Sequence, residues 1–132
     1  MIEIDVSHPI YQQIMDGITR RLVRGDLTVG DQIPSQREMA VILRVSPNTV
    51  QRAYRDLEAL GVVETQRGQG TFVAAPPELV DSLRQEMLRK ALARFVQEML
   101  GLGVGRSEIP KVVQDALSPA APNANMQKPE VT

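Results

Sequence analysis

A short stretch near the middle of the chain, SPNTVQRAYRDLEAL at residues 46–60, carries the residues best suited to recognise a chemical partner. Apolar side chains recur in it with helical spacing, which predicts one buried stripe formed by Val50, Ala53, Tyr54, Leu57 and Leu60. The opposite face then carries a polar row formed by Asn48, Gln51, Arg52 and Arg55. Amide and guanidinium groups of this kind hydrogen-bond to the base edges and phosphates of DNA. An ordinary solvated helix face is the alternative explanation.

The helix that carries this polar row has a predicted start. Ser46 is a favourable N-cap, and Pro47 suits the first helical position because the missing N–H of proline has no acceptor there anyway. Gln51 can pair with adenine, and Arg52 or Arg55 can bind guanine or a phosphate through two N–H groups. The buried stripe would hold the helix rigid while the polar row enters a DNA groove.

An arginine in a second predicted helix is a candidate phosphate-binding residue. The sequence SQRE is a capping-box pattern in which Ser35 and Glu38 satisfy each other's backbone amides. It predicts a helix over residues 36–44 with Arg37 in its first turn, where free amides and a cation favour an anion. A surface ion pair with Glu38 or Asp31 is the alternative role for Arg37.

A glycine-containing loop joins two β-prone runs at residues 62–74 and predicts a hairpin. Gly68 and Gly70 can adopt positive φ, and Gly68 also lets the backbone approach a phosphate closely. Arg67 can reach a minor groove from such a loop. Arg67, Gly68 and Gln69 are therefore candidate DNA-binding residues, and a plain hairpin is the alternative.

No set of residues suited to catalysis accompanies these candidates. His8 is the only histidine, it precedes the first predicted helix, and no serine, carboxylate pair or phosphate loop completes a reactive constellation. The chain has no cysteine, which excludes disulfides and thiolate metal sites. We therefore expect no enzyme, no cofactor and no metal site.

The elements that must position the candidate residues follow from periodicity and from helix start and stop signals. In chain order they are a helix over residues 9–24 ended by Gly25, a turn at 28–34, a helix over 36–44, a helix over 47–60 ended by Gly61, and the hairpin at 62–74. This order is that of a winged helix-turn-helix domain, and we assign it to residues 1–75. The predicted fold is mainly α with a small β-hairpin.

A helical dimerisation element is predicted over residues 76–117, after the linker AAPPE. It comprises a helix over residues 79–100 and a short helix over 108–117, which Ser107 could cap. The long helix carries two neighbouring apolar rows, too extensive to be covered by the short helix and the winged domain, so a homodimer seam is favoured. The candidate seam residues are Leu83, Met87, Leu88, Ala91, Leu92, Phe95 and Met99. A groove for a lipid or small molecule is the alternative, and residues 118–132 are predicted to be a disordered tail.

The overall composition restricts the class of protein only loosely. The net charge is −1, but every cation between Ser35 and Gly70 is an arginine, so a DNA site would be a small patch. The N-terminal segment lacks the apolar run of a secretory signal, and no apolar run approaches the roughly 20 residues of a membrane helix. We expect a soluble cytoplasmic protein with no membrane partner.

The segments PIYQQI and GDQIPSQREMAVILRVSPNTVQRAYRDLEALGVVETQRGQGTFV, across about residues 8–74, resemble the DNA-binding domain of GntR-family bacterial transcription regulators. The short two-helix C-terminus and the NTVQRAY segment resemble the YtrA subfamily, in which the remainder is a dimerisation element. The resemblance implies that Arg37 lies at a phosphate or base, that Ser46, Asn48, Thr49 and Gln51 lie at the start of the recognition helix, and that Arg67 and Gly68 lie at the wing. Other branches often have arginine where this chain has Pro47 and Gln51, so their base preference is not carried over.

These observations together predict a homodimeric transcription regulator, acting as a repressor on an inverted-repeat operator in duplex DNA near its own promoter. The sequence leaves open whether the protein binds a small-molecule effector, and it does not identify one. Two alternatives remain, a winged-helix module whose arginine face docks an acidic protein, and a ligand-carrying protein that uses the apolar C-terminal helix.

Overall fold

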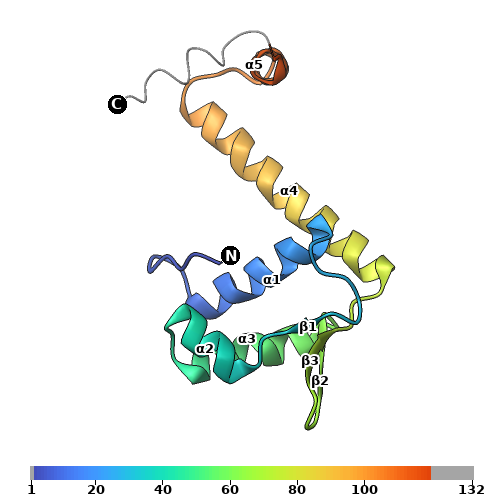
Figure 1. Ribbon diagram of the computed structural model, residues 1–132. Helices are drawn as coiled ribbons and strands as arrows, with labels where there is room; N and C mark the ends of the chain where they lie inside the picture. Colours follow the sequence, from blue (N-terminus) through green and yellow to red (C-terminus); the bar gives the residue numbers. More distant parts are fainter. Residues whose placement is uncertain (1, 120–132) are drawn as a thin grey trace. The chain divides into compact units, whose positions relative to one another are not determined.

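The computed structural model describes residues 2–119, in which short helices and a small sheet precede one long helix (Figure 1). The elements in chain order are α1 (Ile10–Arg24), β1 (Gln32–Ile33), α2 (Gln36–Leu43), α3 (Pro47–Ala59), β2 (Val63–Gln66), β3 (Gly70–Val73), α4 (Pro77–Gly101) and α5 (Ile109–Leu117). The chain divides into two compact units, the first ending at Glu86 and the second beginning at Met87. The first unit has the predicted winged helix-turn-helix order.

Capping interactions determine where the first three helices begin and end. The Ser35 hydroxyl accepts a hydrogen bond from the Glu38 amide at 3.1 Å, and the Glu38 carboxylate accepts one from the Ser35 amide at 2.9 Å. The predicted capping box of α2 is therefore confirmed. Gly25 ends α1 at a φ of 88°, which glycine adopts without a steric penalty. Arg44 ends α2 at a φ of 57°, and this left-handed turn directs the chain towards α3.

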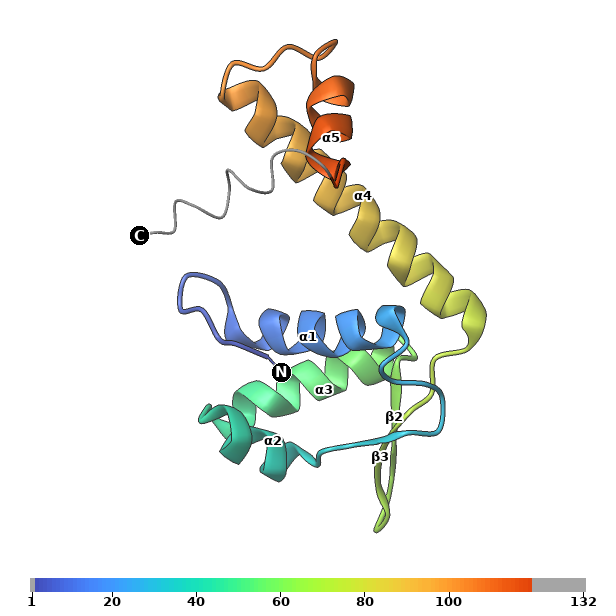
Figure 2. The same cartoon turned by 45° about the horizontal axis from the view of Figure 1, so that its top comes forward.

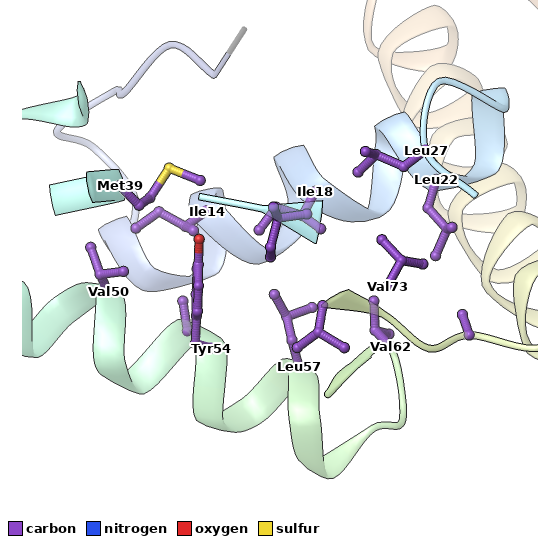
Figure 3. Packing of buried hydrophobic residues seen from close by; sticks show 14 of the residues in the cluster. Ile14, Ile18, Leu22, Leu27, Met39, Val50, Tyr54, Leu57, Val62 and Val73 are labelled. Carbon is purple, nitrogen blue, oxygen red and sulfur yellow. The ribbon is translucent and has the colours of Figure 1, made fainter. Parts of the chain in front are cut away.

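The core of the first unit lies between α1, α2, α3 and the sheet (Figure 3). Ile14, Val50 and Leu57 are fully buried in it, and Tyr54 extends from α3 into the same space. The Tyr54 hydroxyl donates a 2.6 Å hydrogen bond to the Pro34 carbonyl, just before α2. Burial, and secondarily the Glu38 carboxylate, raises the pKa of Tyr54. One side chain thus joins α3 to the segment that leads into α2.

One residue of the predicted α3 stripe does not belong to the core. The prediction that Leu60 is buried is wrong, because 54% of its surface is exposed. The helix ends at Ala59, and Gly61, with a φ of 83°, turns the chain immediately afterwards. Leu60 is the C-cap and keeps right-handed helical dihedral angles, but it is the last residue of the stripe, and Val62 and Val63 after the turn fill the adjacent core space.

The sheet contains a strand that the sequence analysis assigned to a turn. Gln32 and Ile33 form β1, which pairs antiparallel with β3, so the sheet has three strands in the order β1-β3-β2. Hydrogen bonds from the Val73 amide to the Asp31 carbonyl and from the Gly30 amide to the Val73 carbonyl extend this pairing. A two-residue strand has no periodicity of its own, and only its distant partner β3 makes it a strand.

The long helix α4 begins earlier than predicted. It starts at Pro77, so the last two residues of the predicted linker are helical. Leu79, Val80 and Leu83 in its first turns are half-buried against the core of the first unit. Arg84 donates a 2.7 Å hydrogen bond to the Val23 carbonyl in the last turn of α1. The start of α4 is therefore part of the first unit.

The second unit contains the rest of α4 and the short helix α5 (Figure 2). Ser107 does not cap α5, as the N-cap is Glu108 and its side chain makes no cap hydrogen bond. The Glu108 carboxylate instead accepts a 2.8 Å hydrogen bond from the Gly105 amide. No helix within residues 2–119 has the length and hydrophobicity of a membrane span. Residues 120–132 of the predicted tail lie outside the described residues.

Replacing Tyr54 by phenylalanine is expected to lower the free energy of unfolding by about 1–2 kcal/mol, because the Pro34 carbonyl loses its buried donor. The effect should depend on pH. The pKa of Tyr54 is higher in the folded than in the unfolded protein, so its stabilisation is complete below about pH 10 and declines as the pH rises further. Urea unfolding of both proteins between pH 7 and 11 checks this, and a difference that stays constant with pH would contradict it.

Candidate nucleic-acid interface

The N-terminal half of α3 carries the exposed polar row that the sequence predicts. The Ser46 hydroxyl accepts a 3.2 Å hydrogen bond from the Asn48 amide, and Pro47 occupies the first helical turn. The side chains exposed on this half are Pro47, Asn48, Gln51, Arg52 and Arg55, whereas Thr49 is half-buried. Because the opposite face is fully buried, the direction of the row is determined by the core.

A tyrosine of α1, which the sequence analysis did not select, contacts this row. The guanidinium carbon of Arg52 lies 3.7 Å from the centre of the Tyr11 ring, a cation–π arrangement. One guanidinium nitrogen of Arg52 also donates a 3.1 Å hydrogen bond to the Tyr11 hydroxyl. A cation–π contact contributes about 0.5–1 kcal/mol at an exposed site. The only sequence signal was an aromatic residue two positions after Pro9, which gives no indication of its partner.

The Arg52–Tyr11 contact borders a hollow of about 430 Å³. The hollow is lined from α1 and α3 by Pro9, Ile10, Tyr11, Asn48, Thr49 and Arg52. Three residues of the predicted DNA-binding set, Asn48, Thr49 and Arg52, thus line the hollow. The lining combines one cation with amide and hydroxyl groups.

Arg37 lies exposed in the first turn of α2, as predicted. Among residues 2–119 it forms no ion pair, so neither the Glu38 pair nor the Asp31 pair is present. The Glu38 carboxylate accepts from the Ser35 amide, and the Asp31 carboxylate accepts from the Thr28 amide at 2.9 Å. Both carboxylates are therefore engaged with the backbone, which leaves the Arg37 guanidinium available to an external anion.

The hairpin β2–β3 projects from the helices as a wing (Figures 1 and 2). Arg67, Gly68 and Gln69 at its tip are exposed, and Gly68 has a φ of 78°. Gln32 of β1 supports the tip through a 3.2 Å hydrogen bond from its side-chain amide to the Gln69 carbonyl. Gly70, with a φ of 129°, lies against the Gln32 side chain, where a β-carbon would overlap it. Gln32 is a second residue that the sequence analysis missed.

Charge is distributed unevenly over these segments. The exposed cations of α2, α3 and the wing are Arg37, Arg44, Arg52, Arg55 and Arg67. The exposed acid Glu58 accepts a 3.3 Å hydrogen bond from the Thr65 amide at the base of the wing. In the described part of the chain, no group of histidine and carboxylate side chains is arranged to hold a metal ion. The arrangement is suited to binding a polyanion.

The comparison with known proteins identifies the family. The sequence profile of "Bacterial regulatory proteins, gntR family" matches residues 10–73, which span α1 to β3. The chain is 52% identical to the HTH-type transcriptional regulator YhcF of Bacillus subtilis over 103 residues, covering 78% of this chain and 85% of YhcF. It is 38% identical to the HTH-type transcriptional repressor YtrA of the same organism, covering 79% of this chain and 82% of YtrA. The chain belongs to the GntR family, and the predicted YtrA-like resemblance is confirmed.

Solved structures extend the similarity through the C-terminal helices. A GntR family transcriptional regulator from Listeria monocytogenes superposes with a TM-score of 0.75 at 34% identity, covering 84% of this chain and 97% of that one. YtrA from Sulfolobus acidocaldarius superposes with a TM-score of 0.55 at 34% identity, covering 73% of this chain and 97% of that one. The family consists of transcription regulators, so the protein is a DNA-binding regulator and not an enzyme.

The candidate seam residues have different environments along α4. Leu88 is 50% exposed, Leu92 54% and Phe95 38%, and Ala91 is exposed between them. Met87 and Met99 are half-buried. Leu83 differs from the others, because it packs against the core of the first unit. The exposed apolar set therefore begins after Leu83.

Replacing Ser46 by alanine is expected to lower the free energy of unfolding by about 1 kcal/mol, because the Asn48 amide loses its cap acceptor. Ser107→Ala is the matched control, since Ser107 also precedes a helix but caps nothing. Urea unfolding monitored by circular dichroism measures both changes. Equal effects of the two substitutions would show that the Ser46 cap does not contribute to stability.

Proposed function

We propose that this regulator is a cytoplasmic repressor that binds an inverted-repeat operator near its own promoter as a homodimer. The observation that supports it most is the exposed row of Asn48, Gln51 and Arg55 on a helix whose other face is fully buried. An α-helix fits the major groove of B-DNA, and a helix held rigidly by its core needs no further ordering of its backbone on binding. The similar Bacillus subtilis protein YtrA is named a repressor, which supports repression over activation for this chain.

The side chains divide by chemistry into base-contacting and phosphate-contacting groups. Gln51 can donate to and accept from adenine, and Asn48, one turn earlier, has the same amide chemistry. Within residues 2–119 neither Arg37 nor Arg55 forms an ion pair, and guanidinium groups are suited to phosphates. The wing would place Arg67 at the neighbouring minor groove, where Gly68 allows close approach of the backbone.

Two copies of the chain would associate through α4. Leu88, Leu92 and Phe95 leave between a third and slightly more than half of their surfaces exposed, and they lie on neighbouring helical rows. Small Ala91 would allow two such helices to approach closely, with Met87 and Met99 extending the seam. A two-fold pair would hold two recognition helices at a constant separation, so that both half-sites are bound together.

Replacing Gln51 by alanine is expected to weaken operator binding by about 1–3 kcal/mol and to relax preference at one base pair of each half-site. Arg37→Ala should instead weaken operator and unrelated duplexes equally and reduce the salt dependence of binding. Fluorescence anisotropy titration of a duplex panel, selected from random sequence by the parent protein, measures both.

Two outcomes would count against the groove assignment or the function. If Gln51→Ala kept the full base preference, α3 would not contact bases through this residue. If the parent protein selected no sequence from the random pool and bound duplexes only weakly, the rival function of docking an acidic protein would gain support.

Replacing Phe95 by glutamate is expected to convert the dimer into a monomer of 14.6 kDa, because the seam cannot bury an unpaired charge. Operator binding should then fall by about 100-fold, as the two half-sites no longer bind together. Gln97→Glu is the control, since it adds the same charge at an exposed position of the same helix. Sedimentation velocity at micromolar concentration measures the mass, and a parent that is already monomeric would exclude the α4 seam.

A further inference from the structure

Arg52 differs from the other exposed arginines of the interface in being held by a neighbour. Its guanidinium lies 3.7 Å above the centre of the Tyr11 ring, and one of its nitrogens donates to the Tyr11 hydroxyl at 3.1 Å. The Gln12 side-chain amide also donates to this hydroxyl at 3.1 Å. No hydrogen bond or ion pair within residues 2–119 holds Arg37, Arg55 or Arg67 in a comparable way. Tyr11 therefore restricts the orientation of one arginine of the row.

This contact determines which DNA groups Arg52 can reach. The guanidinium lies over a ring of α1, and Tyr11 and Arg52 both line the hollow, so the contact keeps the guanidinium on the side of α3 that borders the hollow. To form a bidentate pair with guanine it would have to leave the Tyr11 ring and lose both contacts. Tyr11 uses only one of the five N–H groups, and no other hydrogen bond holds Arg52 within residues 2–119, so the remaining groups can donate at the edge of the hollow.

The hollow beside Arg52 has the chemistry of a phosphate site. Besides Arg52, its lining includes Thr49, whose hydroxyl can donate to a phosphate oxygen. No carboxylate belongs to its lining. A phosphate bound there would lie next to the base-contacting residues of α3, as expected where a recognition helix enters a groove.

We propose that Tyr11 is a positioning residue that holds Arg52 for a backbone phosphate of the operator, so that Arg52 contributes affinity without base preference. Base discrimination is then left to Asn48 and Gln51. The inference rests on the proposed function, since it assigns roles within an operator complex. It separates two roles, guanine or phosphate, that the sequence leaves open for Arg52.

The decisive experiment measures salt dependence and base preference together. Operator affinity of the full chain is titrated at several salt concentrations for the parent, Arg52→Gln, Tyr11→Phe, Tyr11→Leu and the Tyr11→Leu/Arg52→Gln double variant. The operator and its single-base variants come from the duplexes that the parent selects. Arg20→Gln is the charge control, because Arg20 pairs with Asp16 elsewhere on α1.

The proposal predicts a specific set of outcomes. Arg52→Gln lowers the slope of log affinity against log salt by about 0.9 for each half-site and weakens all duplexes by the same factor. Tyr11→Leu weakens binding roughly three- to tenfold with unchanged base preference, because the Arg52 guanidinium is then no longer held in the position that binds the phosphate. Tyr11→Phe, which keeps the ring and removes the hydroxyl, gives a smaller loss. Tyr11→Leu has no further effect once Arg52 is glutamine, and Arg20→Gln leaves the slope nearly unchanged.

Other outcomes would overturn the proposal. A loss of preference at a single base pair in Arg52→Gln, with an unchanged salt slope, would assign Arg52 to a base. An equal loss from Tyr11→Leu in the presence and absence of Arg52 would make Tyr11 a packing residue only. Tyr11→Phe serves as the variant that retains the packing if Tyr11→Leu fails to fold. A parent protein that selects no operator would overturn the proposed function itself. A parent that binds its operator normally, together with Tyr11 variants that bind equally well, would overturn only the role of Tyr11.

Discussion

The interface depends on the burial of one face of α3. Val50, Ala53, Tyr54 and Leu57 are essentially inaccessible to solvent, and they pack against α1, α2 and the sheet. Side chains on a helix are separated by about 100° along the chain, so fixing the buried face also fixes the direction of the opposite one. The backbone that carries Asn48, Gln51 and Arg55 is therefore ordered before a partner binds. The hydrogen bond from Tyr54 to Pro34 adds a polar restraint to this packing.

The first helix connects the core with both the interface and the start of α4. Ile14, Ile18 and Leu22 bury one face of α1, while Tyr11 near its beginning contacts Arg52 of α3. In the last turn of α1, the Val23 carbonyl accepts from Arg84 of α4. A cation at the end of a helix also interacts favourably with the partial negative charge of the free carbonyls. The same rigid helix is thus contacted by the recognition helix near one end and by the first turns of α4 near the other.

The wing depends on pairing across the sheet and not on its own turn alone. An isolated two-stranded hairpin is marginally stable in water, and here β1 adds a third strand to β3. Gln32 extends this support to the tip by binding the Gln69 carbonyl, and Gly70 leaves the space that the Gln32 side chain occupies. Arg67 therefore lies at the tip of a hairpin that β1 and the Gln32 side chain stabilise.

Interactions between residues close in the chain were predictable from the sequence. The Ser35–Glu38 capping box, the Ser46 cap, the apolar stripes of α1 and α3 and the exposed row of α3 all follow from spacings of a few residues, which the backbone geometry of a helix converts directly into contacts. The family resemblance followed from the same segments. The exposure of Leu60 was not predictable, because periodicity does not show that Val62 and Val63, beyond the turn at Gly61, occupy the core space at the end of the stripe.

Only the tertiary structure decided the contacts between distant residues. Tyr11 and Arg52 lie 41 positions apart, and Gln32 and Gln69 lie 37 apart, so nothing in their local sequence specifies the partner. The two-residue strand β1 exists only because the folded chain brings Gln32 and Ile33 beside β3, and Leu83 is half-buried only because α4 begins against the core. Such contacts form after loops of the chain have closed around a packed core, and their geometry depends on that packing.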